Sequence, residues 1–94
     1  ESANQAVDTD VVLRQVAQLR SRGEHESAVS LLRSVLEREL AQATRERLQY
    51  ELGEILTFQI GDRHRACEQL KKSRSQRYSI EVENAWKHMK CDQD

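Results

Sequence analysis

Two histidine–cysteine pairs share one spacing: His64 precedes Cys67 by three residues, and His88 precedes Cys91 by three residues. Residues three apart lie on the same face of a helix, so each pair would present an imidazole and a thiol together. Two such pairs on neighbouring helices would supply the two nitrogen and two sulfur ligands of a tetrahedral Zn²⁺ site. A zinc-stabilised helical domain is therefore one hypothesis for this chain.

The same cysteines, the only two in the chain, also suit a disulfide between Cys67 and Cys91, which is the interpretation we prefer. Neighbouring helices bring such residues within bonding range. The bond would contribute about 3 kcal/mol to a small core. It would also indicate an oxidising compartment, so we expect a periplasmic or secreted protein. Free thiols in a cytoplasmic protein are the alternative.

No set of residues in the chain favours catalysis. Cys67 with His64 is the one candidate for a nucleophile beside a base, but a cysteine on the core face of a helix is normally inert. The chain has no glycine-rich phosphate loop and no predicted sheet on which to build a nucleotide site. We therefore expect a protein that is not an enzyme and that has no cofactor.

The composition predicts one small domain and excludes two classes of partner. The 94 residues include 33% charged residues, no proline and three glycines, as uninterrupted helices require. The net charge of −1, with both signs interleaved, argues against nucleic-acid binding. No apolar run approaches the ~20 residues of a membrane span. Because the chain begins at Glu1 and not at methionine, we expect a processed or trimmed form.

Apolar side chains recur along the chain with the 3.6-residue period of helices, in five stretches. Residues 1–9 lack this period and are predicted to form a flexible lead-in. The breaks are expected at Gly23, around 41–44, at Gly61 and around 76–79. The predicted fold class is therefore all-α, in a single domain over residues 10–91. In the last stretch Trp86 shares a face with apolar residues and is expected to be buried against the fourth helix.

Two segments repeat one pattern, in which a glycine ends a helical stretch, an acidic residue follows, and an alanine comes five positions after the glycine. They are Arg22-Gly23-Glu24-His25 with Ala28, and Ile60-Gly61-Asp62-Arg63 with Ala66. The glycines are 38 residues apart, which is typical of helical-hairpin repeats. With Leu52-Gly53 and Leu70 added, the second unit resembles the tetratricopeptide repeat (TPR) family. It departs from that pattern because Gly53 to Gly61 is one residue longer than the consensus spacing, and no proline closes either unit.

The resemblance implies a right-handed stack of two antiparallel helical hairpins, at about 10–40 and 44–75, with a C-terminal capping helix at about 79–91. It also implies that the first helix of each hairpin lines a concave groove that binds a peptide or helix of another protein. On that pattern the partner-binding residues are Leu13, Ala17, Arg20, Arg47, Tyr50, Glu54, Thr57 and Phe58. By analogy with such folds, the protein would be an adaptor or assembly helper of a bacterial envelope complex.

Within this groove Tyr50 and Phe58 are the predicted anchors, because they lie two turns apart on one face and aromatic side chains left off a core are typical binding anchors. Arg20, Arg47 and Glu54 would orient the partner. The second half of the chain is also locally basic, which fits either a solvated face or an acidic partner. A structural, self-associating domain is the alternative function, because two repeats are fewer than such stacks usually need.

Overall fold

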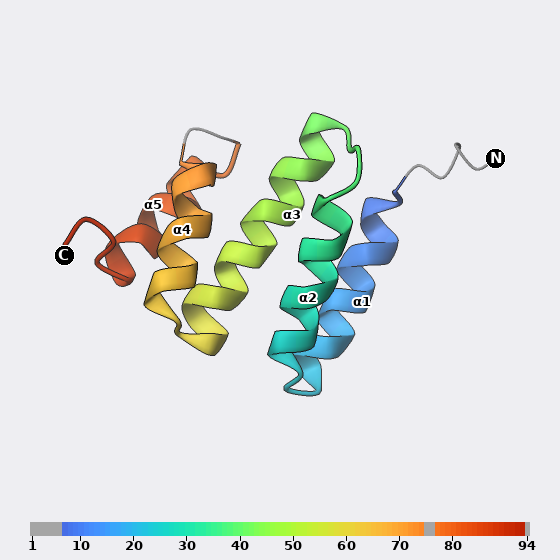
Figure 1. The fold of residues 1–94 in the computed structure, drawn as a ribbon, viewed down its shortest axis with the longest axis horizontal. Helices are drawn as coiled ribbons and strands as arrows, with labels where there is room; N and C mark the ends of the chain where they lie inside the picture. Colours follow the sequence, from blue (N-terminus) through green and yellow to red (C-terminus); the bar gives the residue numbers. More distant parts are fainter. Residues whose placement is uncertain (1–6, 75–76, 94) are drawn as a thin grey trace.

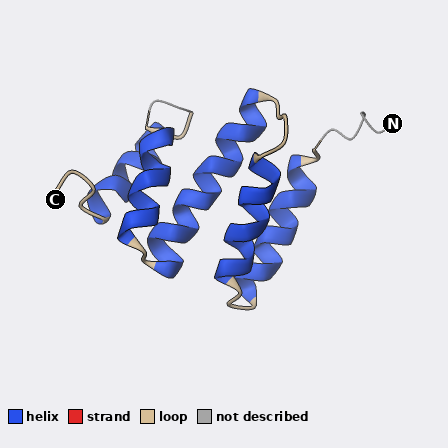
Figure 2. Cartoon of the chain, viewed as in Figure 1, coloured by secondary structure: helices blue, strands red, loops and turns tan. Residues whose placement is uncertain are grey.

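The structure, a computed structural model, describes residues 7–74 and 77–93 of the chain. Within these ranges all regular structure is helical, and no strand occurs (Figures 1 and 2). The elements are α1 (Thr9–Ser21), α2 (His25–Leu36), α3 (Gln42–Glu54), the π-helical turn η2 (Ile55–Ile60), α4 (Arg63–Ser73) and α5 (Ser79–His88). The all-α prediction, with five helices separated by turns, is confirmed for the described part of the chain.

Two glycines end helical segments where the sequence places them. Gly23 follows α1 with φ +76°, and Gly61 follows η2 with φ +74°, the left-handed conformation that costs other residues energy. Next to Gly61, the Asp62 side chain accepts a hydrogen bond from the backbone N–H of Arg65 and caps α4. Asp8 caps α1 in the same way. The glycine–acid pattern of the sequence thus marks real helix boundaries.

The predicted turn between the second and third helices was misplaced. The second helix ends at Leu36 and not near residue 40, and α3 begins at Gln42 and not at Thr44. The earlier end of α2 has a physical reason in Arg45, whose guanidinium donates hydrogen bonds to the carbonyl oxygens of Leu36 and Arg38. These bonds provide donors for carbonyl oxygens at the end of the helix, where the helix itself offers none. Thr44, at the expected start of the second hairpin, hydrogen-bonds the hydroxyl of Thr9 at 2.9 Å.

Between Ile55 and Ile60 the third helical segment changes from an α-helix to a π-helical turn. The Gly61 N–H donates to the Leu56 carbonyl five residues earlier, at 2.9 Å. A π turn holds one residue more than an α turn, which matches the one-residue excess in the Gly53–Gly61 spacing. The turn keeps Ile55 and Leu56 in the core and leaves Phe58 exposed.

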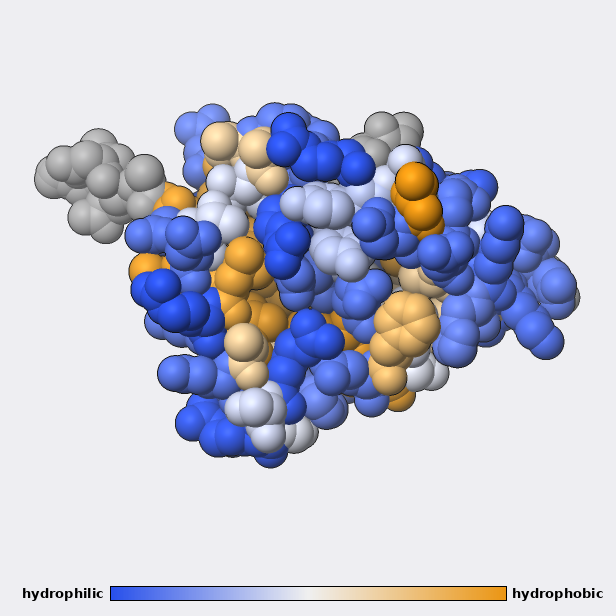
Figure 3. All heavy atoms as spheres, turned by 180° about the vertical axis from the view of Figure 1, so that it is seen from behind, coloured by the Kyte–Doolittle hydropathy of each residue, from blue (hydrophilic) through white to orange (hydrophobic). Residues whose placement is uncertain are grey.

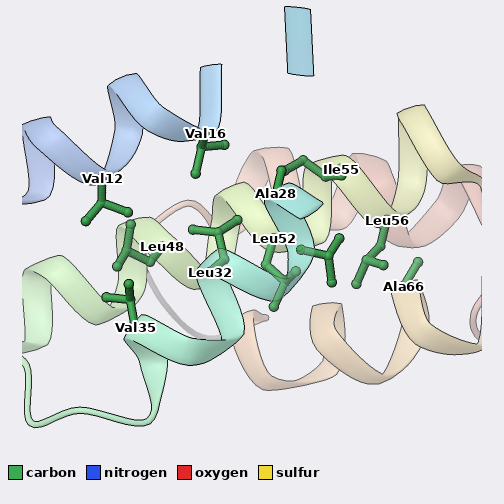
Figure 4. Close-up of a cluster of buried hydrophobic side chains, with 11 residues drawn as sticks. Val12, Val16, Ala28, Leu32, Val35, Leu48, Leu52, Ile55, Leu56 and Ala66 are labelled. Carbon is green, nitrogen blue, oxygen red and sulfur yellow. The ribbon is translucent and has the colours of Figure 1, made fainter. Parts of the chain in front are cut away.

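The main core is aliphatic and joins α1, α2, α3, η2 and the start of α4. Val12 and Val16 of α1 point toward leucines of α2 and α3 (Figure 4). A smaller cluster forms where Leu70 of α4 meets Val82 and Ala85 of α5. Trp86 packs against this second cluster but is only half-buried, contrary to the expected burial, and the guanidinium of Arg74 lies over its ring at 4.4 Å.

Each helix contacts the next along the chain, and α3 also contacts both α1 and α5 (Figure 1). A Cβ atom at Gly53 in α3 would lie 3.0 Å from Leu70 Cδ2, so the missing side chain allows α4 to approach closely. Since α3 contacts every other helix, it is the element on which the rest of the domain is assembled.

A covalent bond and one arginine hold the C-terminal end against α4. The Sγ atoms of Cys67 and Cys91 are 2.10 Å apart, as the predicted disulfide requires. Arg63 donates hydrogen bonds to the backbone carbonyls of Met89, Lys90 and Gln93. The last helix ends at His88, earlier than the predicted residue 91, since the left-handed conformation of Lys90 turns the chain toward the disulfide.

Candidate functional site

The surface built by α1, α3, η2 and α5, which we call the α1/α3/α5 face, contains most of the sequence-predicted binding residues. Contacts of α3 with both α1 and α5 bring these elements together although long stretches of chain separate them. Seen from behind in Figure 3, the molecule shows apolar patches between charged side chains. The face therefore combines apolar contact area with charged groups.

At the centre of this face two tyrosine rings stack. Tyr50 of α3 and Tyr78, just before α5, lie 4.6 Å apart between ring centroids with an interplanar angle of 18°. The guanidinium of Arg47 lies 5.8 and 5.7 Å from the two centroids. A hydrogen bond with Tyr78 raises the pKa of Arg47. The pKa of Tyr50 is raised mainly by burial and next by the nearby Glu54 carboxylate. Tyr50 is thus held in place by its neighbours and half-buried.

Glu51 links the helices at this position, although the sequence analysis did not select it. Arg20 of α1 approaches one carboxylate oxygen at 3.3 Å, and Arg47 approaches the other at 2.8 Å. The Glu51 side chain is only 12% exposed, so both ion pairs are partly shielded from water. Arg20 also donates to the Gln59 side chain of η2. The position of Glu51 four residues after Arg47 was the available sequence signal.

Glu54 lies one turn beyond Tyr50 and two turns beyond Arg47, and its charge is not fully compensated. Burial raises its pKa most, and the Glu51 carboxylate raises it further, while Arg20 opposes both effects. Glu81 of α5 contributes in the same direction as Glu51. Because Arg20 and Arg47 are already paired with Glu51, this part of the face has a partly desolvated negative charge.

Phe58 is the most exposed aromatic side chain among the described residues, at 51%. Its ring lies 4.9 Å from the His88 ring of α5, at a tilt of 44°. The π-helical turn exposes Phe58 while the preceding Thr57 is 3% exposed. An aromatic ring placed in this way offers apolar area to a partner.

The remaining predicted residues divide between core and surface. Leu13 packs against the core and is half-buried, whereas Ala17 is exposed. Thr57 is buried and its Oγ1 has no hydrogen-bond partner, so it does not present its side chain to solvent. Tyr78 and His88, which complete the face, were missed because no helical period connects them with α3.

The histidine–cysteine pairs form no metal cluster in the described part of the chain. Cys67 and Cys91 bond to each other, which removes the two thiolates that the zinc hypothesis needs. His64 lies instead 3.8 Å from Glu68. Residues 7–74 and 77–93 contain no group of three or more histidine, cysteine, aspartate or glutamate side chains suited to hold a metal ion.

Within the same described ranges, no helix has both the length and the apolar character needed to cross a bilayer. No protein-family model, curated protein or solved structure matches this chain.

Proposed function

We propose that this chain is a non-enzymatic protein-binding module that holds a peptide or helix of another protein against the α1/α3/α5 face. The observation that carries the proposal is the half-exposed ring of Phe58, packed against His88, on the face that also holds the Tyr50–Tyr78 stack and the Arg20–Glu51 ion pair. Binding sites on proteins typically pair a few aromatic anchors with polar groups fixed before the partner arrives.

The fold proposed with this function is a TPR-like stack of two hairpins, α1–α2 and α3–η2–α4, with α5 as a capping helix. Two observations support it: α3 contacts α1 and α5 as well as its sequence neighbours, and Gly53 allows the close approach of α4. In that arrangement α1, α3 and α5 form one layer, while α2 and α4 form the other.

The residues of the face indicate how a partner segment would bind. Phe58 and the exposed part of Tyr50 contact its apolar side chains, and Ala17 leaves room for its backbone. Glu54 is placed to receive a lysine or arginine, because a cation would offset the burial and the charge repulsion from Glu51 that raise its pKa. Arg20 and Arg47, held by Glu51, keep the surface rigid.

The proposal extends to the setting of the protein. The disulfide between Cys67 and Cys91 supports an oxidising compartment, so we place the module in the periplasm or outside the cell. An adaptor or assembly helper of a bacterial envelope complex is the role that we propose there. That step depends on analogy with helical-hairpin modules.

The test is a pull-down from the native source with three baits: the natural protein, Tyr50→Ala with Phe58→Ala, and the ring-preserving control Tyr50→Phe with Phe58→Tyr. All three must show the same helical circular dichroism. We expect the alanine bait to lose the captured partner and the control bait to retain most of it, because hot-spot truncation costs about 2 kcal/mol or more. Equal capture by all three baits would place the interface elsewhere.

A further inference from the structure

A cleft opens between α2 and α4, with α3 beneath it, and it uses none of the residues of the α1/α3/α5 face. Its volume is about 370 Å³, within the size range of pockets that bind ligands. The lining is mostly polar and charged. It consists of Arg33, Leu36, Glu37, Arg45, Gln49, Leu52, Arg65, Glu68, Gln69 and Lys72.

Four cations and two carboxylates line this cleft, so its charge is positive although the whole chain has a net charge of −1. Arg45 and Arg65 already have partners: the end of α2 for Arg45, and the carboxylates of Glu26 and Asp62 for Arg65. In the described ranges the side chains of Arg33 of α2 and Lys72 of α4 form no hydrogen bond or ion pair, and Arg33 acts on Glu26 only through its charge, as the weakest of the influences on the pKa of Glu26. These two side chains are therefore available to an anionic ligand.

Two glutamine side chains in the lining have buried amide atoms without partners. Gln69 of α4 is only 7% exposed, and its Nε2 donor has no hydrogen-bond acceptor. The Oε1 acceptor of Gln49 in α3 also lacks a donor. Nearly all buried polar groups in proteins are hydrogen-bonded, so two unpaired amides in one cleft require an explanation. A ligand that offers both an acceptor and a donor would provide it.

We infer that the α2/α4 cleft binds an acidic, extended segment of a partner protein. A peptide backbone offers a carbonyl oxygen for the Gln69 amide and an N–H for the Gln49 amide, once these side chains turn toward it. An aspartate or glutamate side chain of the same segment pairs with Arg33 or Lys72 through charge-assisted hydrogen bonds. The half-buried side chain of Leu36 contacts the segment between these polar groups.

A peptide fits this lining better than a nucleic acid does. Glu37 and Glu68 lie among the cations and would repel a phosphate backbone. Nucleic-acid surfaces also carry an uninterrupted basic stripe, whereas the cations here are separated by amides and leucines. The inference makes use of the basic bias in the second half of the chain, which the α1/α3/α5 face leaves unexplained.

The experiment uses the full chain and a fluorescein-labelled, capped octapeptide of alternating glutamate and threonine. The matched probe has lysine in place of glutamate, and single-stranded RNA of similar length is a third probe. We expect the glutamate peptide to bind at least tenfold more tightly than the lysine peptide at low salt, with an affinity that falls as salt is added. In isotopically labelled protein, the side-chain amide signals of Gln49 and Gln69 should shift when it binds.

Charge reversal at the two exposed cations, Arg33→Glu with Lys72→Glu, should reduce binding of the glutamate peptide at least tenfold without affecting folding. Gln69→Leu should weaken binding while preserving the salt dependence, and Phe58→Ala on the other face should change nothing. Equal affinity for the two peptides, tighter binding of the RNA, or binding that survives the charge reversal would overturn the inference. These results are separate from those that test the α1/α3/α5 face.

Discussion

At the scale of one residue, Glu54 is a side chain of the candidate face whose charge lowers the stability of the fold. Its carboxylate is partly buried near Glu51 and Glu81, and its pKa is raised above the usual 4.5. A group whose pKa is higher in the folded state contributes stability below its unfolded pKa, and that contribution is lost as the pH rises through the folded value. At neutral pH the ionised carboxylate therefore destabilises the fold, as is common at sites kept for binding.

Glu54→Gln should consequently raise the melting temperature at pH 7, because the amide removes the charge and keeps an oxygen to accept the hydrogen bond from Tyr50. The gain should shrink as the pH falls through the raised pKa of the folded-state carboxyl group, and it should vanish below about 4.5, the usual value, where the group is neutral in both states. Thermal melts across this pH range measure it. Glu39→Gln, at an exposed position, changes the net charge equally and serves as the control; the same gain from both variants would refute the explanation.

The disulfide makes a prediction at the same scale. It joins residues 24 positions apart, and closing a loop of that length restricts the unfolded chain enough to contribute about 3 kcal/mol. Cys67→Ala with Cys91→Ala should therefore lower the melting temperature by about 12 °C or more, and a reductant should lower that of the natural protein similarly. Alkylation of two thiols in unreduced protein would contradict this account.

At the scale of the element, η2 explains how the third helical segment holds one residue more than the TPR-like spacing. The extra residue is taken up by hydrogen bonding over five residues, so Ile55 and Leu56 remain in the core and Phe58 faces outward. The longer Gly53–Gly61 spacing and the exposure of Phe58 on the candidate face therefore have the same origin, the π-helical turn.

Deletion of Gln59 should convert η2 into regular α-helix and leave a cooperatively folded protein, because the deletion removes only the excess residue. Deletion of Gln49 from α3 is the matched control. It rotates the residues after the deletion by about 100° relative to those before it, so that Leu48 and the buried face at Leu52, Ile55 and Leu56 can no longer keep their present places in the core together, which should abolish folding. Circular dichroism and thermal melts of the two variants test the prediction, and equal damage from both deletions would show that η2 holds no dispensable residue.

The sequence was informative where a helix boundary depends on local chemistry. Gly23 and Gly61 adopt the left-handed conformation that ends a helix, and Asp62 caps the next one, so these boundaries could be predicted. The end of α2 could not, because it depends on hydrogen bonds from Arg45 nine residues later and no glycine or proline marks the turn. In the same way, the stacking of Tyr50 on Tyr78 depends on tertiary packing that no sequence period reveals.

At the scale of the whole molecule, α3 separates two surfaces of different character. One is the α1/α3/α5 face, where Phe58 is exposed and Glu54 has an uncompensated charge. The other is the cleft between α2 and α4, which carries cations and unpaired amides. Two surfaces with opposite preferences would allow one small domain to hold two partner segments at once, which is what the proposed adaptor role requires.

The most direct measurement of the central claim is nuclear magnetic resonance mapping of a bound peptide. A peptide selected from a random displayed library against the natural protein is added to isotopically labelled protein, and the backbone signals that move are assigned. The account predicts shifts around Phe58, along α1, α3 and α5, and a loss of affinity of about 30-fold for Phe58→Ala. Shifts confined to α2 and α4, together with unchanged binding by Phe58→Ala, would contradict it.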